Sequence, residues 1–253
     1  MTTTTGYAVL TPGGRLEPWT FERRDLRPDD VRIRITFCGV CHSDLTAITH
    51  ASDVPLVPGH EFVGEVAAVG SSVTTFQPGD AVAVGNIVDS CGECVACQDE
   101  EESYCLEFPT LTYGGVDRRD GTPRHGAYSR EMVVRDRFVY ALPQGLDPAG
   151  VAPLMCAGIT VWQPLKRYGV GEGTRVGVVG LGGLGHLTVK FAKRSVPRSQ
   201  CSPHPKASAP MPLPWARTRS CCPPRPTRWP PTPTLSTSSS TPPRARTTSA
   251  PTC

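Results

Sequence analysis

The sequence predicts an α/β chain in three parts, which are a β-rich front half, a single strand–turn–helix unit and a tail of different composition. Up to about residue 140, short β-type runs alternate with turn residues. Residues 180–185 then form a glycine-rich turn behind an apolar run, and the periodicity stops after Arg194. We therefore expect a small β-barrel or sandwich, the first βα unit of a parallel sheet, and a disordered tail.

The strands of the front half are predicted from three runs. Residues 31–35 alternate strictly between apolar and charged side chains, and residues 62–69 form a longer apolar run. Residues 80–84 follow the turn at 77–79. Short β-type runs separated by turn residues are typical of a small β-barrel or sandwich.

The second part begins with a helix and continues with a buried strand. Residues 148–168 have a helical pattern that ends near Gly169. Residues 174–179 are apolar and are predicted to form a buried strand, and residues 186–193 are predicted to form a helix after the glycine turn. A strand, a glycine turn and a helix N-terminus, in that order, are the context of a dinucleotide-binding turn.

Composition divides the chain at the same place as the pattern does. All 23 Asp and Glu lie before residue 173, whereas residues 195–253 hold 15 of the 27 Pro, 8 of the 26 Lys and Arg, and no Gly. The front part therefore has 18 basic against 23 acidic residues, a net charge of −5, and the tail has +8. The overall charge of +3 is the sum of two parts of opposite sign, so the mild basicity of the whole chain describes neither part.

No targeting segment is evident, so we expect a cytoplasmic protein without a membrane span. The sequence has no run of 18 apolar residues, and its start has neither a basic segment nor a long apolar stretch. In a reducing compartment, 11 cysteines at patterned spacings indicate metal binding or catalysis rather than a set of disulfides.

Four of these cysteines form a C-x2-C-x2-C-x7-C motif within one loop. The four residues are Cys91, Cys94, Cys97 and Cys105. Four thiolates can surround one zinc ion tetrahedrally and leave no open position, so a metal here is expected to be structural. An iron–sulfur cluster and a chance grouping of free cysteines are the alternatives.

A second set of metal-ligand residues is scattered over the chain. It comprises Cys41 in the segment CGVCHSD, the pair His60 and Glu61 in PGHE, and Cys156. Mixed Cys, His and carboxylate ligands from separate segments suit a catalytic zinc ion that keeps one position for water or substrate. Taken singly, each residue has an ordinary structural explanation, such as packing for Cys156.

Five motifs in this order, CGVCHSD, PGHE, CGECVAC with its fourth Cys, MCAGIT and GLGGLGH, resemble the zinc-dependent medium-chain alcohol dehydrogenases. The resemblance covers residues 7–193 and is greatest to the cinnamyl-alcohol-dehydrogenase-like, NADP-dependent aldehyde reductases. It implies a GroES-like β-barrel catalytic domain at 1–155, the start of a truncated Rossmann domain at 156–194, and a tail at 195–253.

The resemblance also implies roles for single residues. Cys41, His60 and Cys156 would hold the catalytic zinc, with Glu61 as an exchangeable or second-shell ligand. Ser43 matches the hydroxyl that starts the proton relay, and Asp44 matches the carboxylate that orients the histidine ligand. Cofactor contacts fall on His42, Thr160, Gly180, Leu181, Gly182, Gly183, Leu184 and Gly185.

One position departs from the pattern of the family. The similar reductases often carry a histidine five residues after the first zinc cysteine as the outer proton shuttle, and here that residue is Thr46. His50 is near in sequence. The sequence therefore does not identify the group that follows Ser43 in the proton relay.

The tail is predicted to be disordered, since Pro, Ser, Thr, Arg and Ala predominate in it and cannot bury enough apolar surface to offset chain entropy. A basic interaction tail and a reading-frame error are the two explanations of this composition, and we expect the second, through one lost base near Arg194. The shifted frame permits Leu-Gly-Ala-Glu-Val-Thr-Val from 195–201 and Leu-Gly-Ala-Asp-Ala-Val-Val-Leu from 215–222, two strand signals. Between them it permits a hydroxyl and lysine cluster that suits the 2′-phosphate of NADP(H).

These features predict an oxidoreductase with one catalytic and one structural zinc that interconverts primary alcohols and aldehydes with NADP(H) rather than NAD(H), impaired in this chain by truncation. The expected partners are small molecules, without nucleic acid or membrane, and the homodimer of the intact family is not expected to form normally. The alternatives are a non-catalytic zinc-binding remnant and a binder of acidic partners through the basic tail.

Overall fold

The computed structural model describes residues 1–195. The predicted tail beyond Ser195, and the frameshift inferred within it, lie outside the described residues.

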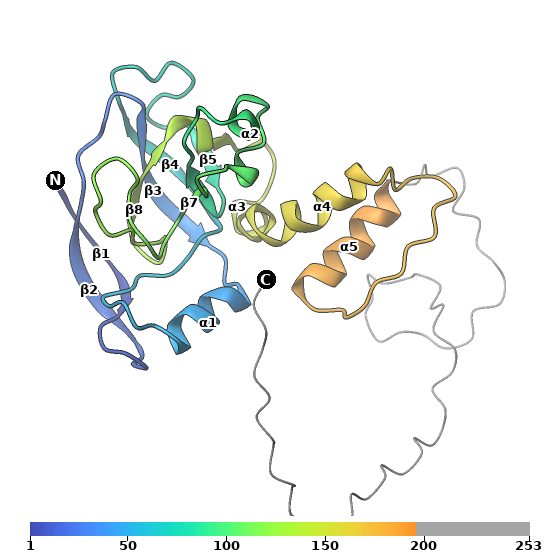
Figure 1. The fold of residues 1–253 in the computed structure, drawn as a ribbon, viewed down its shortest axis with the longest axis horizontal. Coiled ribbons are helices and arrows are strands. Elements are labelled where there is room, and N and C mark those ends of the chain that lie inside the picture. Colours follow the sequence, from blue (N-terminus) through green and yellow to red (C-terminus); the bar gives the residue numbers. More distant parts are fainter. Residues whose placement is uncertain (196–253) are drawn as a thin grey trace, which may run out of the picture. The chain divides into compact units, whose positions relative to one another are not determined.

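The front half consists of short antiparallel strands (Figure 1). Its strands are β1 (Thr2–Val9), β2 (Leu16–Arg23), β3 (Asp30–Cys38), β4 (Phe62–Val69), β5 (Ala81–Val84), β6 (Ile87–Asp89), β7 (Thr110–Leu111), β8 (Glu131–Arg135) and β9 (Tyr140–Ala141). The strands predicted at 31–35, 62–69 and 80–84 are confirmed as β3, β4 and β5.

These strands form one five-stranded sheet and two hairpin-like pairs. The order in the large sheet is β8-β3-β4-β5-β9, and the pairs are β1-β2 and β6-β7. Arg32 and Ile33 on β3 lie opposite Val133 and Met132 on β8, so the alternation along β3 directs every second side chain to one face. The prediction of a β-rich first part is therefore confirmed, and the structure shows that its strands pair antiparallel.

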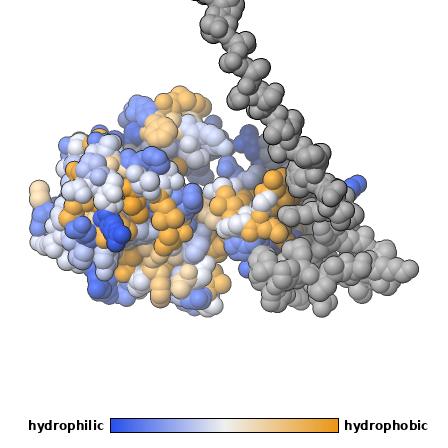
Figure 2. All heavy atoms as spheres, turned by 90° about the horizontal axis from the view of Figure 1, so that it is seen from below, coloured by the Kyte–Doolittle hydropathy of each residue, from blue (hydrophilic) through white to orange (hydrophobic). Residues whose placement is uncertain are grey.

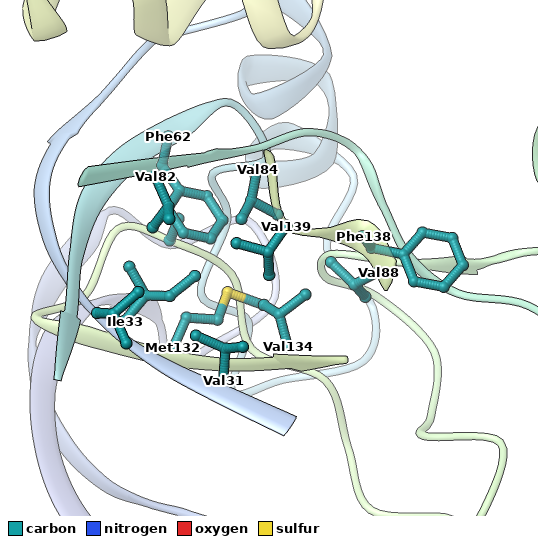
Figure 3. Packing of buried hydrophobic residues seen from close by; sticks show 12 residues of the cluster. Val31, Ile33, Phe62, Val82, Val84, Val88, Met132, Val134, Phe138 and Val139 are labelled. Atoms are coloured by element: carbon teal, nitrogen blue, oxygen red, sulfur yellow. The ribbon is translucent and has the colours of Figure 1, made fainter. Parts of the chain in front are cut away.

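Side chains from four strands of the large sheet and from the segments beside it form the main core (Figure 3). Its fully buried members include Ile33, Phe62, Val82 and Met132. Valine and isoleucine predominate because branched side chains pack well on a pleated surface. This core fixes the strands whose ends and connecting loops carry the candidate site.

The helices lie in the loops of the front half and in the second part of the described chain. They are α1 (His42–Thr49), α2 (Val95–Gln98), η1 (Glu102–Tyr104), η2 (Asp136–Phe138), α3 (Pro148–Val151), η3 (Ala152–Met155), α4 (Ala157–Arg167) and α5 (Gly183–Arg194). None of these described helices combines the length and the apolar character needed to cross a bilayer.

The helix predicted at 148–168 is present but divided. Cys156, with φ −121° and ψ −76°, interrupts it between η3 and α4. The helix ends as predicted at its C-terminus, where Gly169 adopts φ 62° and its N–H donates to the carbonyl of Lys166. The break matters because it turns the backbone at a candidate metal ligand.

The prediction of a buried strand at 174–179 is wrong. No strand is assigned there, Val176 is 40% exposed and Val179 is fully exposed. A strand requires a hydrogen-bonded neighbour, and none of the described segments pairs with these residues.

Figure 2 shows that apolar residues gather in groups between hydrophilic ones on the face seen there.

An ion-pair network ties the start of β3 to the loop after β7. Asp117, whose side chain is 3% exposed, lies 3.0 Å from Arg27 Nη2, 3.2 Å from Arg124 Nη1 and 3.4 Å from Arg24 Nε. Burial alone would raise the pKa of Asp117, but hydrogen bonds from Arg27 and from the Arg119 amide outweigh it and lower the pKa to about 2.

This low pKa predicts a loss of stability in acid. Because the pKa of Asp117 is lower in the folded chain than the value of about 4 expected when unfolded, its contribution is complete above pH 4 and is lost as the pH falls toward 2. Asp117→Asn should lower the free energy of unfolding by about 3 kcal/mol at pH 7 and by much less near pH 2. Denaturant unfolding between pH 2 and 7 measures this.

The matched control is Asp53→Asn, which changes an exposed loop carboxylate. If Asp117→Asn lowered the free energy of unfolding by the same amount at every pH, the low pKa of Asp117 in the folded chain would be contradicted.

Candidate metal centre and active site

The four cysteines of the loop motif lie around the short helices α2 and η1. Cys91 follows β6, Cys94 is the N-cap of α2, Cys97 lies within α2, and Cys105 follows η1. Their sulfur atoms all lie within 4.8 Å of one another, and the Cys91 and Cys97 sulfurs are 3.8 Å apart. Tetrahedral thiolates at about 2.3 Å from a zinc ion lie about 3.8 Å apart, so the donor set and its spacing fit zinc.

Backbone amides point at these sulfurs. The N–H groups of Cys94, Cys91 and Leu106 donate to the sulfurs of Cys91, Cys105 and Cys94 respectively, at 3.3–3.5 Å. The amides of Leu106 and Cys97 lower the pKa of Cys94 to about 6. These amides therefore favour the thiolate form of Cys94, whereas at Cys91 the hydrogen bond from the Cys94 amide is outweighed by burial and by side-chain hydrogen bonds with Cys94 and Cys105, which raise the pKa of Cys91 to about 11.

The second cluster combines three residues from distant segments. Cys41 is the N-cap of α1, His60 precedes β4, and Cys156 lies at the break between η3 and α4. The His60 Nε2 is 3.2 Å from the Cys156 sulfur, which is 3.9 Å from the Cys41 sulfur. Two sulfurs and one imidazole nitrogen within 4.8 Å form three corners of a tetrahedron.

Asp44, on the first turn of α1, holds His60 in this orientation. Its Oδ1 accepts hydrogen bonds from His60 Nδ1 and the Gly59 amide, and its Oδ2 accepts one from the Cys41 amide, each at 3.0 Å. Burial would lower the pKa of His60, but hydrogen bonds with Asp44 and Cys156 outweigh burial and raise it to about 10. The arrangement directs Nε2 toward the sulfurs.

Ser43 lies beside this cluster, whereas the two candidates for an outer relay group do not. The Ser43 Oγ is 3.5 Å from His60 Nε2. Thr46 Oγ1 donates to the carbonyl of His42, and His50 Nδ1 donates to the carbonyl of Thr46. Both side chains thus bond back along α1, and no continuation of the relay from Ser43 is identified through either.

Glu61 is buried next to the cluster but is not grouped with its three ligand atoms. Burial raises the pKa of Glu61 to about 7. Its Oε1 lies 2.6 Å from the place that a Cβ on Gly39 would occupy, so the carboxylate rests against the Gly39 backbone. Any larger residue at 39 would displace it.

Two tyrosines near the cluster belong to none of the sequence motifs and are not predicted from the sequence. The ring of Tyr113 lies 5.8 Å from that of His60, and burial raises the pKa of Tyr113. The hydroxyl of Tyr128 donates to Asp44 Oδ2 at 3.2 Å. Both tyrosines come from the region between β7 and β8, which is distant in sequence from α1, so only the tertiary fold identifies them.

The residues expected to contact a cofactor lie on α1, on α4 and around the start of α5. His42 and Thr160 are exposed, and Thr160 lines a surface cavity of about 570 Å³ together with Tyr104 and Gln163. In the glycine turn, Gly180 has φ 84° and Gly182 is the N-cap of α5. The turn is accessible, since Leu181 and Leu184 are 48% and 44% exposed.

Gly185 is the most constrained glycine of this turn. A Cβ on it would lie 1.9 Å from the carbonyl oxygen of Gly180, so only glycine fits there. The close approach brings the N-terminal amides of α5, which begins at Gly183, next to the turn. Free amides at a helix N-terminus are suited to bind a phosphate group.

Residues 27–144 match the model of the alcohol dehydrogenase GroES-like domain. The chain is also similar in sequence and in structure to cinnamyl alcohol dehydrogenases, which confirms the resemblance to the zinc-dependent medium-chain dehydrogenases of this type.

The chain is 45% identical over 192 residues to the probable cinnamyl alcohol dehydrogenase 6 of Arabidopsis thaliana, covering 74% of this chain and 52% of the relative. A cinnamyl alcohol dehydrogenase of Sorghum bicolor has 44% identity and a TM-score of 0.74, with 77% of this chain and 57% of that chain covered.

The Helicobacter pylori cinnamyl alcohol dehydrogenase, solved as a complex with NADP(H), has 37% identity and a TM-score of 0.74, with 77% of this chain and 58% of that chain covered. The chain thus spans about half the length of the curated relatives that it matches.

Proposed function

We propose that the chain is built as a zinc-dependent oxidoreductase that interconverts primary alcohols and aldehydes with NADP(H). In this proposal, residues 1–155 are the catalytic domain and residues 156–194 begin the nucleotide-binding domain. The observation that carries it is the convergence of Cys41, His60 and Cys156 from three separate segments. Three protein ligands leave the fourth tetrahedral position to water or substrate, as a catalytic zinc requires.

The residues around this cluster fit the metal by their chemistry. Two thiols and one imidazole are the ligands that zinc prefers, and Asp44 holds His60 with Nε2 directed at both sulfurs. When bound there, zinc would polarise the oxygen of an aldehyde or lower the pKa of an alcohol. Glu61 is proposed as an exchangeable or second-shell ligand, since its buried carboxylate adjoins His60 in sequence.

Ser43 is proposed to move the proton. Its hydroxyl lies 3.5 Å from His60 Nε2, so it would lie near a substrate oxygen bound at the open position of the site. Its exposure gives a route for the proton to solvent. The four-cysteine cluster, by contrast, has no open position, so we propose that it holds a structural zinc ion.

The glycine turn is the proposed site for the pyrophosphate of NADP(H). The amides of 180–185 and the N-terminus of α5 supply donors for an anion, and His42 and Thr160 are proposed to contact the rest of the cofactor. The preference for NADP(H) is supported by the NADP(H) complex of the Helicobacter pylori relative.

A second candidate is a zinc-binding remnant without turnover. It is favoured by the exposure of residues 174–179, which join no sheet within the described residues. Without a sheet behind the glycine turn, a nicotinamide ring would not be positioned against the metal, and misplacement of the reacting atoms is costly in rate. We accordingly expect impaired turnover from this chain.

Metal content and turnover distinguish these functions. We expect the purified chain to contain two zinc ions, measured by mass spectrometry of the metal, and to oxidise NADPH with an aromatic aldehyde slowly or not at all. Cys156→Ser should reduce the content to one ion, and Cys38→Ser, which changes a cysteine outside both clusters, should not. Robust turnover would contradict the impairment, and a metal-free chain would contradict both functions.

A further inference from the structure

We infer that Tyr128 is a positioning residue for the metal site of Cys41, His60 and Cys156, acting through the carboxylate of Asp44; this inference rests on the proposed function. The hydroxyl of Tyr128 donates to Asp44 Oδ2 at 3.2 Å, and Asp44 Oδ1 in turn accepts from His60 Nδ1 at 3.0 Å. The chain of contacts therefore runs from a phenol through a buried carboxylate to the imidazole that faces both sulfurs.

Asp44 is the point at which three segments of the chain meet. Its Oδ1 is bonded to the Gly59 amide and to His60, and its Oδ2 to the Cys41 amide and to Tyr128. Each oxygen thus has two donors, and the two pairs set the rotation of the carboxylate. Without the phenol, Oδ2 keeps the hydrogen bond from the Cys41 amide, and Asp44 keeps its interaction with the Tyr113 side chain. The orientation of Oδ1 toward His60 is nevertheless less restricted.

Tyr128 is held in place independently of its hydroxyl, because its side chain packs against a small apolar cluster that includes Phe21 and Val57, and backbone hydrogen bonds fix its segment. The Tyr128 amide donates to the carbonyl of Pro58 at 2.9 Å, and the Ala127 amide donates to that of Gly59 at 2.9 Å. On the other side, the buried Arg23 donates to the carbonyl of Gly126 at 2.8 Å. Removal of the hydroxyl alone should therefore leave the backbone and the ring where they are.

The absence of a side chain at Gly59 leaves room for the ring of Tyr128 to contact Asp44. A Cβ at Gly59 would lie 2.6 Å from Cδ1 of Tyr128 and 2.8 Å from its amide nitrogen. Gly59 also has φ 98°, a conformation that other residues rarely adopt. The same glycine thus allows the turn before His60 and the contact of the phenol with Asp44.

Cobalt(II) provides a test that does not depend on turnover, because its visible and near-ultraviolet spectrum distinguishes a four-thiolate site from a site with two thiolates and one imidazole. Tyr128→Phe should weaken cobalt binding at the mixed site about tenfold, the lower end of the effect of outer-shell partners on metal affinity. Binding at the four-cysteine cluster should be unchanged, which makes that cluster an internal control for folding.

A double-mutant cycle with Asp44→Asn separates action through the carboxylate from a general effect. If Tyr128 acts through Asp44, Tyr128→Phe should have little further effect in the Asp44→Asn background. The matched control is Tyr7→Phe, which removes the hydroxyl of an exposed tyrosine on β1 and should leave both sites unchanged.

The possible outcomes separate this inference from the proposed function. A wild-type chain that takes up cobalt only at the four-cysteine cluster contradicts the proposed function, and the role of Tyr128 fails with it. Uptake at both sites with unchanged affinity in Tyr128→Phe overturns the role of Tyr128 alone. An equal loss at both sites, or a tenfold loss that persists in the Asp44→Asn background, also overturns it.

Discussion

Replacing Cys97 by serine is expected to remove one metal ion per chain and to lower the free energy of unfolding by about 3 kcal/mol or more. The side chain of Cys97 is fully buried, and its sulfur is 3.8 Å from that of Cys91. A serine hydroxyl remains protonated and binds zinc poorly, so three thiolates and a buried hydroxyl would replace a closed site. Calorimetric unfolding and metal analysis of the same samples measure both effects.

The control for this experiment is Cys38→Ser, because Cys38 belongs to neither cluster. It should retain two metal ions, and its change in stability measures the cost of exchanging a core-packed thiol for a hydroxyl without loss of a metal ligand. A Cys97→Ser protein with a full complement of metal and unchanged stability would show that the four-cysteine cluster holds no structural ion.

The substitution Gly59→Ala is expected to destabilise the chain by about 3 kcal/mol and to abolish metal binding at the mixed site. The new methyl group would meet both the ring and the backbone of Tyr128, at 2.6 Å and 2.8 Å. Gly59 also has φ 98° and its amide donates to Asp44, so a shift here moves His60 directly. Denaturant unfolding and cobalt spectra measure the two effects.

Gly13→Ala is the matched control, since Gly13 has φ 71° but nothing within 4 Å of the added Cβ. It isolates the cost of the left-handed backbone, about 1 kcal/mol. If Gly59→Ala costs no more than Gly13→Ala, the contact with Tyr128 does not constrain this loop.

The sequence allows local features to be predicted better than those that depend on distant partners. The four-cysteine loop spans 15 residues, so its spacing alone indicates a metal site. The mixed cluster joins residues 115 positions apart, and its members could be selected only through the resemblance to a family. Tyr128 could not be found in this way, because its partner Asp44 lies 84 positions away and no motif links the two.

The strand prediction at 174–179 is wrong for the same reason, because a strand depends on partners that are distant in the sequence. The run of apolar residues is a local signal, and it is present in the sequence as expected. The hydrogen bonds that turn such a run into a strand come from neighbours, and none of the described segments supplies them. The helix α5 after the glycine turn does not need such a neighbour, and it forms.

The two clusters differ in how far apart their ligands lie in the sequence, and this difference affects the order in which they form during folding. Bringing Cys91 and Cys105 together closes a loop of 14 residues, whereas bringing Cys41 and Cys156 together closes one of 115 residues. The loop-closure entropy of the longer loop costs about 2 kcal/mol more at room temperature. The loop cluster can therefore form early in folding as a local nucleus, whereas the mixed cluster can be completed only when most of the front half has reached its native topology.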